Sequence, residues 1–267
     1  MSKAEQRANM PKGTQAVLDR RTVENSNSNL LNLVQNGQSV LDIGCGSGSI
    51  TAGIAKLVGP SGHVVGIDTS PHLIELAKEQ YRDINNLHFE LADFYSYKST
   101  QLFDVVSSAR VLQWLAHPDK ALEQMIKYVK PNGFLSILDY NHCKIEWNPM
   151  PPESMLAFYE AFLKWRADAG MDNGIADRLA ELFKKRGLKN IVEEDFSEIS
   201  ERHVTSFSDD VGIWKKVAET RGQQVVGDGY FEEEIRLQAI EDYSRWIKNE
   251  GISMKLYLRA ITGQKQD

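Results

Sequence analysis

Glycines alternate with other residues in the segment from Asp42 to Gly48 (DIGCGSG), directly after an apolar stretch. Glycine permits a positive φ and carries no Cβ, so a ligand can approach the main chain closely. If a helix begins after Gly48, its first N–H groups face the same space and attract polar ligand groups. The spacing therefore predicts a ligand-binding turn between a strand and a helix.

A second acid, Asp68, ends the next apolar stretch, 20 residues after Gly48. A carboxylate at this place can accept hydrogen bonds from both hydroxyls of an adenosine ribose. The alternative is that Asp68 merely provides negative charge at the start of a helix near Ser70. Because turn and acid occur together at the spacing of a nucleoside site, we favour the ribose interpretation.

The charge of Asp42 narrows the choice of ligand. A dinucleotide would place its pyrophosphate at the turn, and a fixed carboxylate would repel it. A ligand that carries an ammonium or a sulfonium suits this position better. The glycine spacing also differs from the dinucleotide form, which has its third glycine where this chain has Ser49.

These residues need a sheet to position them, and the sequence predicts one. Apolar stretches at 39–43, 63–67, 87–91, 103–107 and 134–140 alternate with helical patterns at 50–58, 72–81 and 119–129. Such alternation indicates parallel strands joined by helices that cover both faces. Right-handed crossovers then give an α/β fold with a doubly wound sheet.

After Tyr140 the pattern changes. Helical patterns follow at 152–169, 174–187, 208–221 and 231–249, with strands near 189–198 and 253–261. The two late strands would bring a mostly parallel sheet to seven strands, the last one antiparallel at an edge. We expect an N-terminal helical segment (1–37), a binding core (38–140), and a remainder (141–267) that completes the sheet and inserts a helical cap over the substrate site.

The composition excludes several classes of protein. The 267 residues carry a net charge of −6, which disfavours a nucleic-acid partner. No apolar run approaches the roughly 20 residues of a membrane span, and the polar start at 1–14 does not favour a signal peptide. Cys45 and Cys143 are too few for a disulfide scaffold or a structural zinc site. A cytoplasmic location is expected.

As a set, the motifs resemble those of class I S-adenosylmethionine-dependent methyltransferases, which have a Rossmann-like fold. The matching segments are VLDIGCGSGSIT (40–51), VVGIDTS (64–70), LADF (91–94), FDVVSSARVLQWL (103–115) and VKPNGFLSI (129–137). The resemblance spans about 38–140 and implies S-adenosylmethionine as the cofactor. Outside that range it says little.

The resemblance implies one role for each matched position. Asp42 would lie near the ammonium of the cofactor, Asp68 would hold the ribose and Asp93 the adenine amino group. Cys45 would be a small filler within the turn, and Arg21, or its neighbour Arg20, would bind the carboxylate unless it lies on a solvated helix face. The implied cofactor-binding residues are Asp42, Gly44, Cys45, Gly46, Gly48, Asp68, Thr69, Asp93, Phe94, Ser108, Ala109, Arg110 and Arg21.

Two histidines are candidates for acid–base catalysis. His117 follows the fourth predicted strand and His142 the fifth. Histidine titrates in the range that proton transfer requires. A base is needed only if the acceptor is a hydroxyl or a protonated nitrogen. The alternative for His117 is a helix start, because Pro118 follows it.

The expected activity is methyl transfer to a small-molecule acceptor by in-line displacement. The alternatives are a protein or RNA methyltransferase, a non-catalytic S-adenosylmethionine-binding protein and a nicotinamide-dependent oxidoreductase. DNA bases are disfavoured because residues 107–110 (SSAR) lack an Asn/Asp-Pro-Pro-aromatic segment. Aromatic residues at helical spacing in 155–165 either pack the cap or line the acceptor site. The acceptor, the methylated atom and the oligomeric state stay open.

Overall fold

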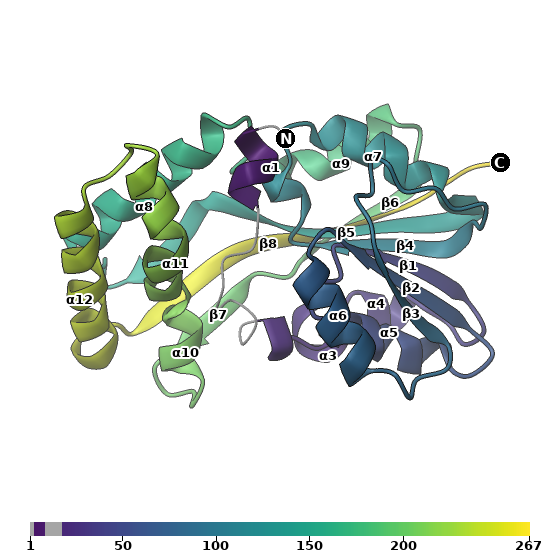
Figure 1. The fold of residues 1–267 in the computed structure, drawn as a ribbon, viewed down its shortest axis with the longest axis horizontal. Coiled ribbons are helices and arrows are strands. Elements are labelled where there is room, and N and C mark those ends of the chain that lie inside the picture. The colour runs from purple at the N-terminus through teal and green to yellow at the C-terminus, as the bar shows by residue number, and fades with distance from the viewer. Residues whose placement is uncertain (1–2, 9–17) are drawn as a thin grey trace.

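The computed structural model describes residues 3–8 and 18–267, whose strands form one eight-stranded sheet (Figure 1). The strand order is β3-β2-β1-β4-β5-β8-β6, and β7 pairs with β8 beside β6. The strands are β1 (Ser39–Ile43), β2 (His63–Asp68), β3 (Leu87–Leu91), β4 (Phe103–Ala109), β5 (Val129–Asn148), β6 (Lys189–Asp195), β7 (Glu198–Glu201) and β8 (Ser253–Gln264).

The direction of the strands places the functional crevice. Strands β1 to β5 run parallel, whereas β8 is antiparallel to β5, β6 and β7. The chain moves outward from β1 to β3 and then returns to the other side of β1 with β4. Ligands of such sheets bind at this switch point, outside the carboxyl ends of the strands. The predicted α/β class with a mostly parallel sheet is confirmed.

Helices cover both faces of the sheet because its central strands are apolar on both sides. Every residue of β1 is buried, as expected for a strand inside a parallel sheet. One face carries α7 (Pro118–Lys127) and α9 (Ile175–Lys185) (Figure 1). The other carries α3 (Val23–Ser26), α4 (Leu30–Leu33), α5 (Ser49–Val58) and α6 (Pro71–Gln80).

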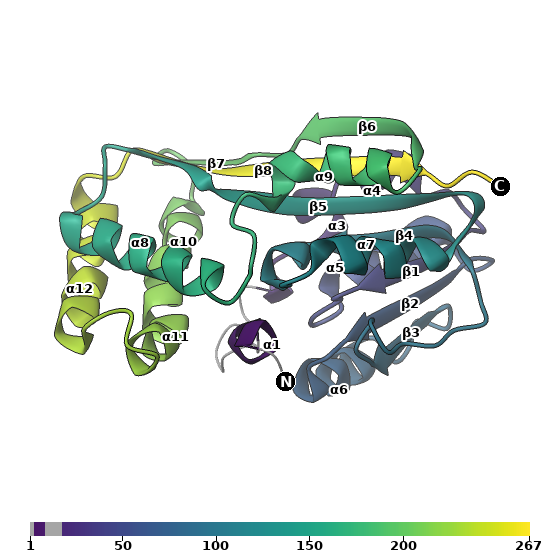
Figure 2. The ribbon, with the colours of Figure 1, turned by 90° about the horizontal axis from the view of Figure 1, so that it is seen from above.

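A second apolar cluster lies beyond the sheet, at the far ends of β5 and β8 (Figure 1). We call it the helical cap; it consists of α8 (Glu153–Ala167), α10 (Phe207–Val211), α11 (Ile213–Gly227) and α12 (Glu233–Asn249). Trp165 and Trp246 are fully buried within it. The short helix α1 (Lys3–Ala8) lies between the helical cap and the sheet, as both views show (Figure 2).

Some elements differ in extent from the expectation. Strand β7 is an addition to the seven predicted strands; its four residues are too short to give a clear alternating pattern. The helix predicted at 208–221 is divided into α10 and α11 at Gly212. Strand β5 begins at Val129, before the apolar stretch predicted at 134–140, and Asn132 within it has a φ of 62°. None of the described helices is both long and apolar enough to cross a membrane.

Candidate active site

The glycine turn connects β1 to α5 and is built largely by its main chain. The N–H groups of Gly44 and Cys45 donate to the carbonyl of Ile67, at 2.8 and 3.1 Å. Gly44 has a φ of 78°, and a Cβ there would lie 2.3 Å from Val111 Cγ2. Glycine is therefore required by conformation and by space, and the turn is held against the end of β2.

Asp68 joins the turn to the start of α6. Its Oδ2 accepts the N–H of Gly46 and its Oδ1 accepts the N–H of Ser70, each at 2.9 Å. Burial raises the pKa of this carboxyl above its ordinary value. A carboxylate oxygen has two lone pairs, so both oxygens retain the capacity to accept ribose hydroxyls. Asp68 therefore both provides negative charge at the start of α6, beside Ser70, and offers acceptor atoms to a ligand.

Asp42 is the buried acid at the centre of the site. Its side chain is 4% exposed, and the hydroxyl of Thr51 donates to Oδ2 at 2.6 Å. Burial, opposed by the hydrogen bond from Thr51 and assisted by the charge of the nearby Asp68, raises the pKa of Asp42 to about 6. A cation placed here would relieve the repulsion between the two carboxylates.

The loop after β3 supplies the side of the site predicted for adenine. Asp93 Oδ1 accepts the N–H of Tyr95 at 3.0 Å. The ring of Phe94 is buried and lies 4.1 Å, centroid to centroid, from that of Tyr95. The turn fixes the carboxylate and the aromatic wall in one place.

A cavity of about 640 Å³ unites these features. This volume falls within the roughly 300–1,000 Å³ typical of ligand pockets. Of the predicted cofactor-binding residues, those that line it are Arg21, Asp42, Gly44, Cys45, Gly46, Asp68, Thr69, Asp93, Phe94, Ala109 and Arg110.

Gly48 and Ser108 are not among the described residues that line the cavity. Gly48 has a φ of 79°, and a Cβ there would lie 2.5 Å from Phe89 Cζ, so it serves packing. Ser108 is 1% exposed and donates to the carbonyl of Ile43 at 2.9 Å, which joins β4 to β1. Both residues therefore stabilise the elements that carry the site, Gly48 by packing and Ser108 by joining β4 to β1, and they do not line the cavity.

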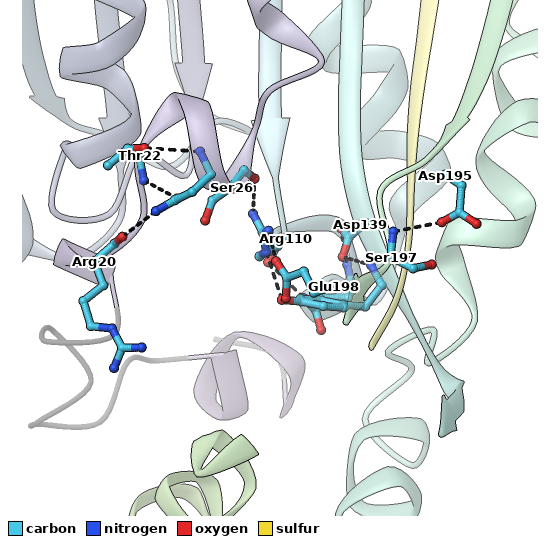
Figure 3. A network of polar contacts seen from close by, with 11 residues as sticks. Arg20, Thr22, Ser26, Arg110, Asp139, Asp195, Ser197 and Glu198 are labelled. Atoms are coloured by element: carbon cyan, nitrogen blue, oxygen red, sulfur yellow. Dashed lines mark hydrogen bonds and ion pairs between the residues drawn. The ribbon is translucent and has the colours of Figure 1, made fainter. Parts of the chain in front are cut away.

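Arg110 has a more elaborate setting than the sequence suggests (Figure 3). Its φ is 62°, and its Nε donates to the Tyr140 hydroxyl at 3.0 Å. Nη1 donates to the carbonyl of Ser26 at 2.8 Å, and Nη2 contacts Glu198 Oε1 at 2.5 Å. Although burial would raise the pKa of Glu198, Arg110 and Arg21 hold it below its ordinary value. No sequence pattern marks Glu198, which comes from the short β7.

The two N-terminal arginines separate in role. Arg21 lines the cavity, and burial together with the charge of Arg110 lowers its pKa. Arg20 instead forms ion pairs with Asp209 and Asp210 of α10, both at 3.0 Å, and its side chain is half exposed. Arg21 is thus the better candidate for the carboxylate of a ligand.

The wall opposite the turn is formed by residues that the sequence did not single out. Trp114, in the 3₁₀ helix η1 (Leu112–Trp114), lines the cavity together with Arg221 of α11. The helix α1 contributes Ala4, Glu5 and Ala8. Its Arg7 is anchored in the cap by an ion pair with Asp228 at 2.8 Å. No periodic pattern marks these residues because they come from distant parts of the chain.

The two histidines occupy different surroundings. His117 is exposed, precedes the first residue of α7 and lines the cavity. His142 is buried behind η1, where Nε2 lies 2.5 Å from Gln113 Oε1. Burial and the charge of Arg166 lower the pKa of His142 well below its ordinary value. His142 is not among the described residues that line the cavity.

The aromatic residues of α8 pack the helical cap. Phe158, Phe162 and Trp165 are at most 1% exposed and belong to its apolar cluster. They are not among the described cavity-lining residues. Of the two alternatives for this stripe, its placement favours packing.

Comparison with known proteins decides the family. A family model described as a methyltransferase domain matches residues 35–200. The chain belongs to this family. It is a class I S-adenosylmethionine-dependent methyltransferase, and its cofactor is S-adenosylmethionine.

Individual relatives share parts of the chain. An uncharacterised methyltransferase of Schizosaccharomyces pombe is 35% identical over 43% of this chain and 44% of its own length. Demethylmenaquinone methyltransferase of Lactobacillus johnsonii is 28% identical over 69% of this chain and 79% of its own length. The chain thus spans less than half of the first of these methyltransferases and most of the second.

Solved structures share the fold. Phosphoethanolamine N-methyltransferase 2 of Haemonchus contortus, bound to S-adenosylhomocysteine, has a TM-score of 0.56 at 17% identity, covering 90% of this chain and 53% of that one. The YcgJ protein of Bacillus subtilis has a TM-score of 0.56 at 16% identity, covering 90% and 97%. These likenesses support the Rossmann-like arrangement.

The residues present fit the cofactor. The main chain at Gly44 and Gly46 is uncovered by Cβ atoms, which allows close approach of the methionine portion. Asp42 offers a buried acid to the ammonium, and Arg21 a half-buried cation to the carboxylate. The donor set therefore matches an amino acid joined to a nucleoside.

Proposed function

We propose that the protein methylates a small-molecule acceptor. One observation carries this proposal: the cavity is lined both by the glycine turn and by α1 and α11, which lie across it from the sheet. Trp114, Leu115 and Ala116 add an apolar wall beyond the end of β4. A protein or RNA substrate would favour a long open groove instead. The relatives named for demethylmenaquinone and phosphoethanolamine support a small acceptor.

We infer that the cofactor lies along the ends of β1, β2 and β3, next to the end of β4. In this arrangement Asp42 accepts from the ammonium, Arg21 binds the carboxylate and Asp68 holds the ribose. Asp93 and the main chain of Phe94 receive the adenine. Ala109 and Arg110 form the floor beside the reacting methyl group, because Ala109 ends β4 at the switch point and Arg110 follows it.

The chain contributes to the reaction chiefly by positioning. S-adenosylmethionine supplies an electrophilic methyl group bonded to a sulfonium. The apolar wall excludes water, which would compete as an acceptor. The acceptor must be held about 3 Å from the methyl carbon, in line with the carbon–sulfur bond.

Proton transfer, where the acceptor requires it, is proposed for His117, which reaches the cavity. His142 is proposed as a positioning residue, because it contacts Gln113, which precedes Trp114 in η1. Gln113 is further fixed by its main-chain N–H, which donates to Asp139 at 3.2 Å. Together, the contacts of Gln113 with His142 and Asp139 orient η1 and the apolar wall that begins at Trp114.

The first test measures binding of S-adenosylhomocysteine by calorimetry. Asp68→Ala is expected to weaken it at least about tenfold, because charged hydrogen bonds contribute about 1.5–3 kcal/mol. Asp83→Ala is the matched control, since the Asp83 side chain is almost fully exposed. Absence of binding by the unsubstituted protein, or equal binding by Asp68→Ala, contradicts the proposed arrangement.

The second test identifies the acceptor class. The protein is incubated with methyl-labelled S-adenosylmethionine and separate fractions of an extract: dialysable molecules, protein and RNA. Label is expected in the dialysable fraction. Label in protein or RNA alone supports the macromolecular alternative, and binding without transfer to any fraction supports a non-catalytic protein.

A further inference from the structure

A buried amide lies in the short stretch that joins the floor of the cavity to its apolar wall. Gln113 belongs to η1, is 3% exposed and directly precedes Trp114, which lines the cavity. Arg110, three positions earlier, is part of the floor that we place beside the reacting methyl group. The contacts of Gln113 therefore affect both surfaces between which methyl transfer takes place.

Towards the floor, Gln113 makes a hydrogen bond with the main chain. Its Nε2 donates to the carbonyl of Arg110 at 3.2 Å. Arg110 has a φ of 62°, a left-handed conformation that is uncommon for residues other than glycine and depends on support from its surroundings. The amide of Gln113 supplies part of that support.

Towards the sheet, Gln113 contacts two residues of β5. Its main-chain N–H donates to Asp139 Oδ2 at 3.2 Å, and its Oε1 lies 2.5 Å from His142 Nε2. An amide oxygen only accepts, so the proton of this bond belongs to Nε2 of His142. Burial together with the charge of Arg166 lowers the pKa of His142, which keeps the ring neutral. The amide has one orientation, because its nitrogen faces the carbonyl of Arg110.

Towards the helical cap, Gln113 binds Arg166 of α8 twice. Nη1 of Arg166 donates to Oε1 at 3.2 Å, and Nη2 donates to the main-chain carbonyl at 2.8 Å. The guanidinium also lies over the indole of Trp114, with Cζ 4.4 Å from a ring centroid. One arginine of the cap is thus fixed against two consecutive residues of η1.

Arg166 is an expensive residue to bury. It is fully enclosed, and its Nε has no hydrogen-bond partner among the described residues. Burial lowers its pKa to about 10, although the charge of Asp139 opposes the change, so the guanidinium stays charged at neutral pH. Buried ions of this kind contribute little net stability compared with apolar side chains of similar size. Their presence here is better explained by the single arrangement that they fix.

We propose that Gln113 is a positioning residue, which fixes the apolar wall at Trp114 relative to the methyl floor at Arg110 and joins both to the helical cap through Arg166. This inference rests on the proposed function and adds a residue that is not among the described residues lining the cavity. A misplacement of about 1 Å between reacting groups can cost about 100-fold in rate. Loss of the Gln113 amide is therefore expected to slow methyl transfer and to leave cofactor binding intact.

The first measurement needs no acceptor. The chain contains five tryptophans, and labelling with 5-fluorotryptophan gives each one a fluorine resonance in the NMR spectrum. Trp114→Phe identifies the resonance of Trp114, which is expected to be single and narrow with S-adenosylhomocysteine bound. Gln113→Met keeps the length of the side chain but removes its amide. It is expected to broaden or split the Trp114 resonance more than the others, with S-adenosylhomocysteine affinity unchanged.

The second measurement follows label from methyl-labelled S-adenosylmethionine into the dialysable fraction of an extract. Gln113→Met is expected to lower kcat about 10- to 100-fold, with the KM for S-adenosylmethionine unchanged. A residue that only stabilised the fold would instead lower the amount of active protein, and all the tryptophan resonances would change together.

Three control variants separate the possible causes. Gln124→Met removes a hydrogen-bonded amide of α7 and is expected to change neither measurement. Gln113→Glu keeps oxygen acceptors for Arg166 and is expected to retain the narrow Trp114 resonance. Gln113→Met combined with Arg166→Met removes the buried charge together with its partner, which covers the case in which Gln113→Met does not fold. This double variant is expected to show the broadened Trp114 resonance and the lowered kcat.

The outcomes that overturn the inference are distinct. A Trp114 resonance that stays narrow in Gln113→Met would show that the ring is held without Gln113, for example by Arg221, whose Cζ lies 4.1 Å from a ring centroid of Trp114. Equal broadening of all the tryptophan resonances, an unchanged kcat or a loss of S-adenosylhomocysteine affinity in Gln113→Met would each overturn it as well. An unsubstituted protein that transfers label to no fraction contradicts the proposed function itself, and the fluorine spectra then still decide the inference on Gln113.

Discussion

Replacing Asp42 with Asn tests the charge at the centre of the site. The substitution keeps the size of the side chain and removes the buried negative charge that we place beside the cofactor ammonium. Loss of a charge-assisted hydrogen bond costs about 1.5–3 kcal/mol. Asp42→Asn is therefore expected to weaken S-adenosylhomocysteine binding about 10- to 100-fold near pH 7.5.

The pH dependence gives the sharper signature. Asp42 has a pKa of about 6 in the free protein, raised mainly by burial. Binding of a cation requires the ionised carboxylate, so the affinity of the unsubstituted protein should be constant above this pKa. Below it, one proton must be released for each ligand bound, and the affinity should fall about tenfold per pH unit. Asp42→Asn has no such proton to release and should lose this dependence.

The assay is calorimetry between pH 5 and 8 with two ligands. Methylthioadenosine retains the nucleoside but lacks the ammonium and the carboxylate, so Asp42→Asn should bind it as the unsubstituted protein does. The reasoning is refuted if affinity for S-adenosylhomocysteine is flat across this range. It is also refuted if Asp42→Asn preserves the slope or weakens both ligands equally.

The stability of the folded protein should depend on pH in the opposite direction to the ligand affinity. Because the pKa of Asp42 is raised on folding, from 3.8 to about 6, the folded protein binds more protons between these values. The contribution of this residue to the free energy of unfolding therefore falls as pH rises through this window. Asp42→Asn should remove that loss, so at neutral pH the variant is expected to melt higher than the unsubstituted protein. A lower Tm would show that the bond from Thr51 outweighs the cost of burying the charge.

Three further substitutions test other parts of the site. Gly48→Ala should destabilise the protein by about 1–3 kcal/mol in denaturant unfolding, since its Cβ would lie 2.5 Å from Phe89, whereas Gly187→Ala has a similar φ and open space and should cost less. Arg110→Met should cost about 3 kcal/mol because it leaves Glu198 without its closest cation, and Glu198→Gln in the same chain should recover part of that loss. His142→Phe should lower Tm yet leave S-adenosylhomocysteine affinity unchanged by calorimetry; a large loss of affinity would place His142 at the ligand.

Local chemistry explains why much of the fold was predictable. The buried run of β1, the glycines after it and the acid at the end of β2 lie within one strand–helix–strand unit, where sequence spacing fixes spatial spacing. The start of α6 could also be predicted, because Ser70 followed by Pro71 is typical of a helix N-terminus. In the structure, the Ser70 hydroxyl accepts the N–H of Leu73 at 3.5 Å. The sequence alone therefore determined the parallel core, the turn and the order of the acids around it.

Long-range packing decided the remainder. Arg221 reaches Trp114 from a helix more than a hundred positions later, and Glu198 reaches Arg110 across 88 positions. Neither contact leaves a periodic signal, because an isolated arginine or glutamate within a polar stretch resembles any solvated residue. The structure also showed that His142 is enclosed and His117 open, a difference set by whichever elements pack over each ring. The cofactor side of the cavity can thus be predicted from local sequence, because its residues belong to one strand–helix–strand unit. The acceptor side forms only when the helical cap, α1 and the sheet pack together.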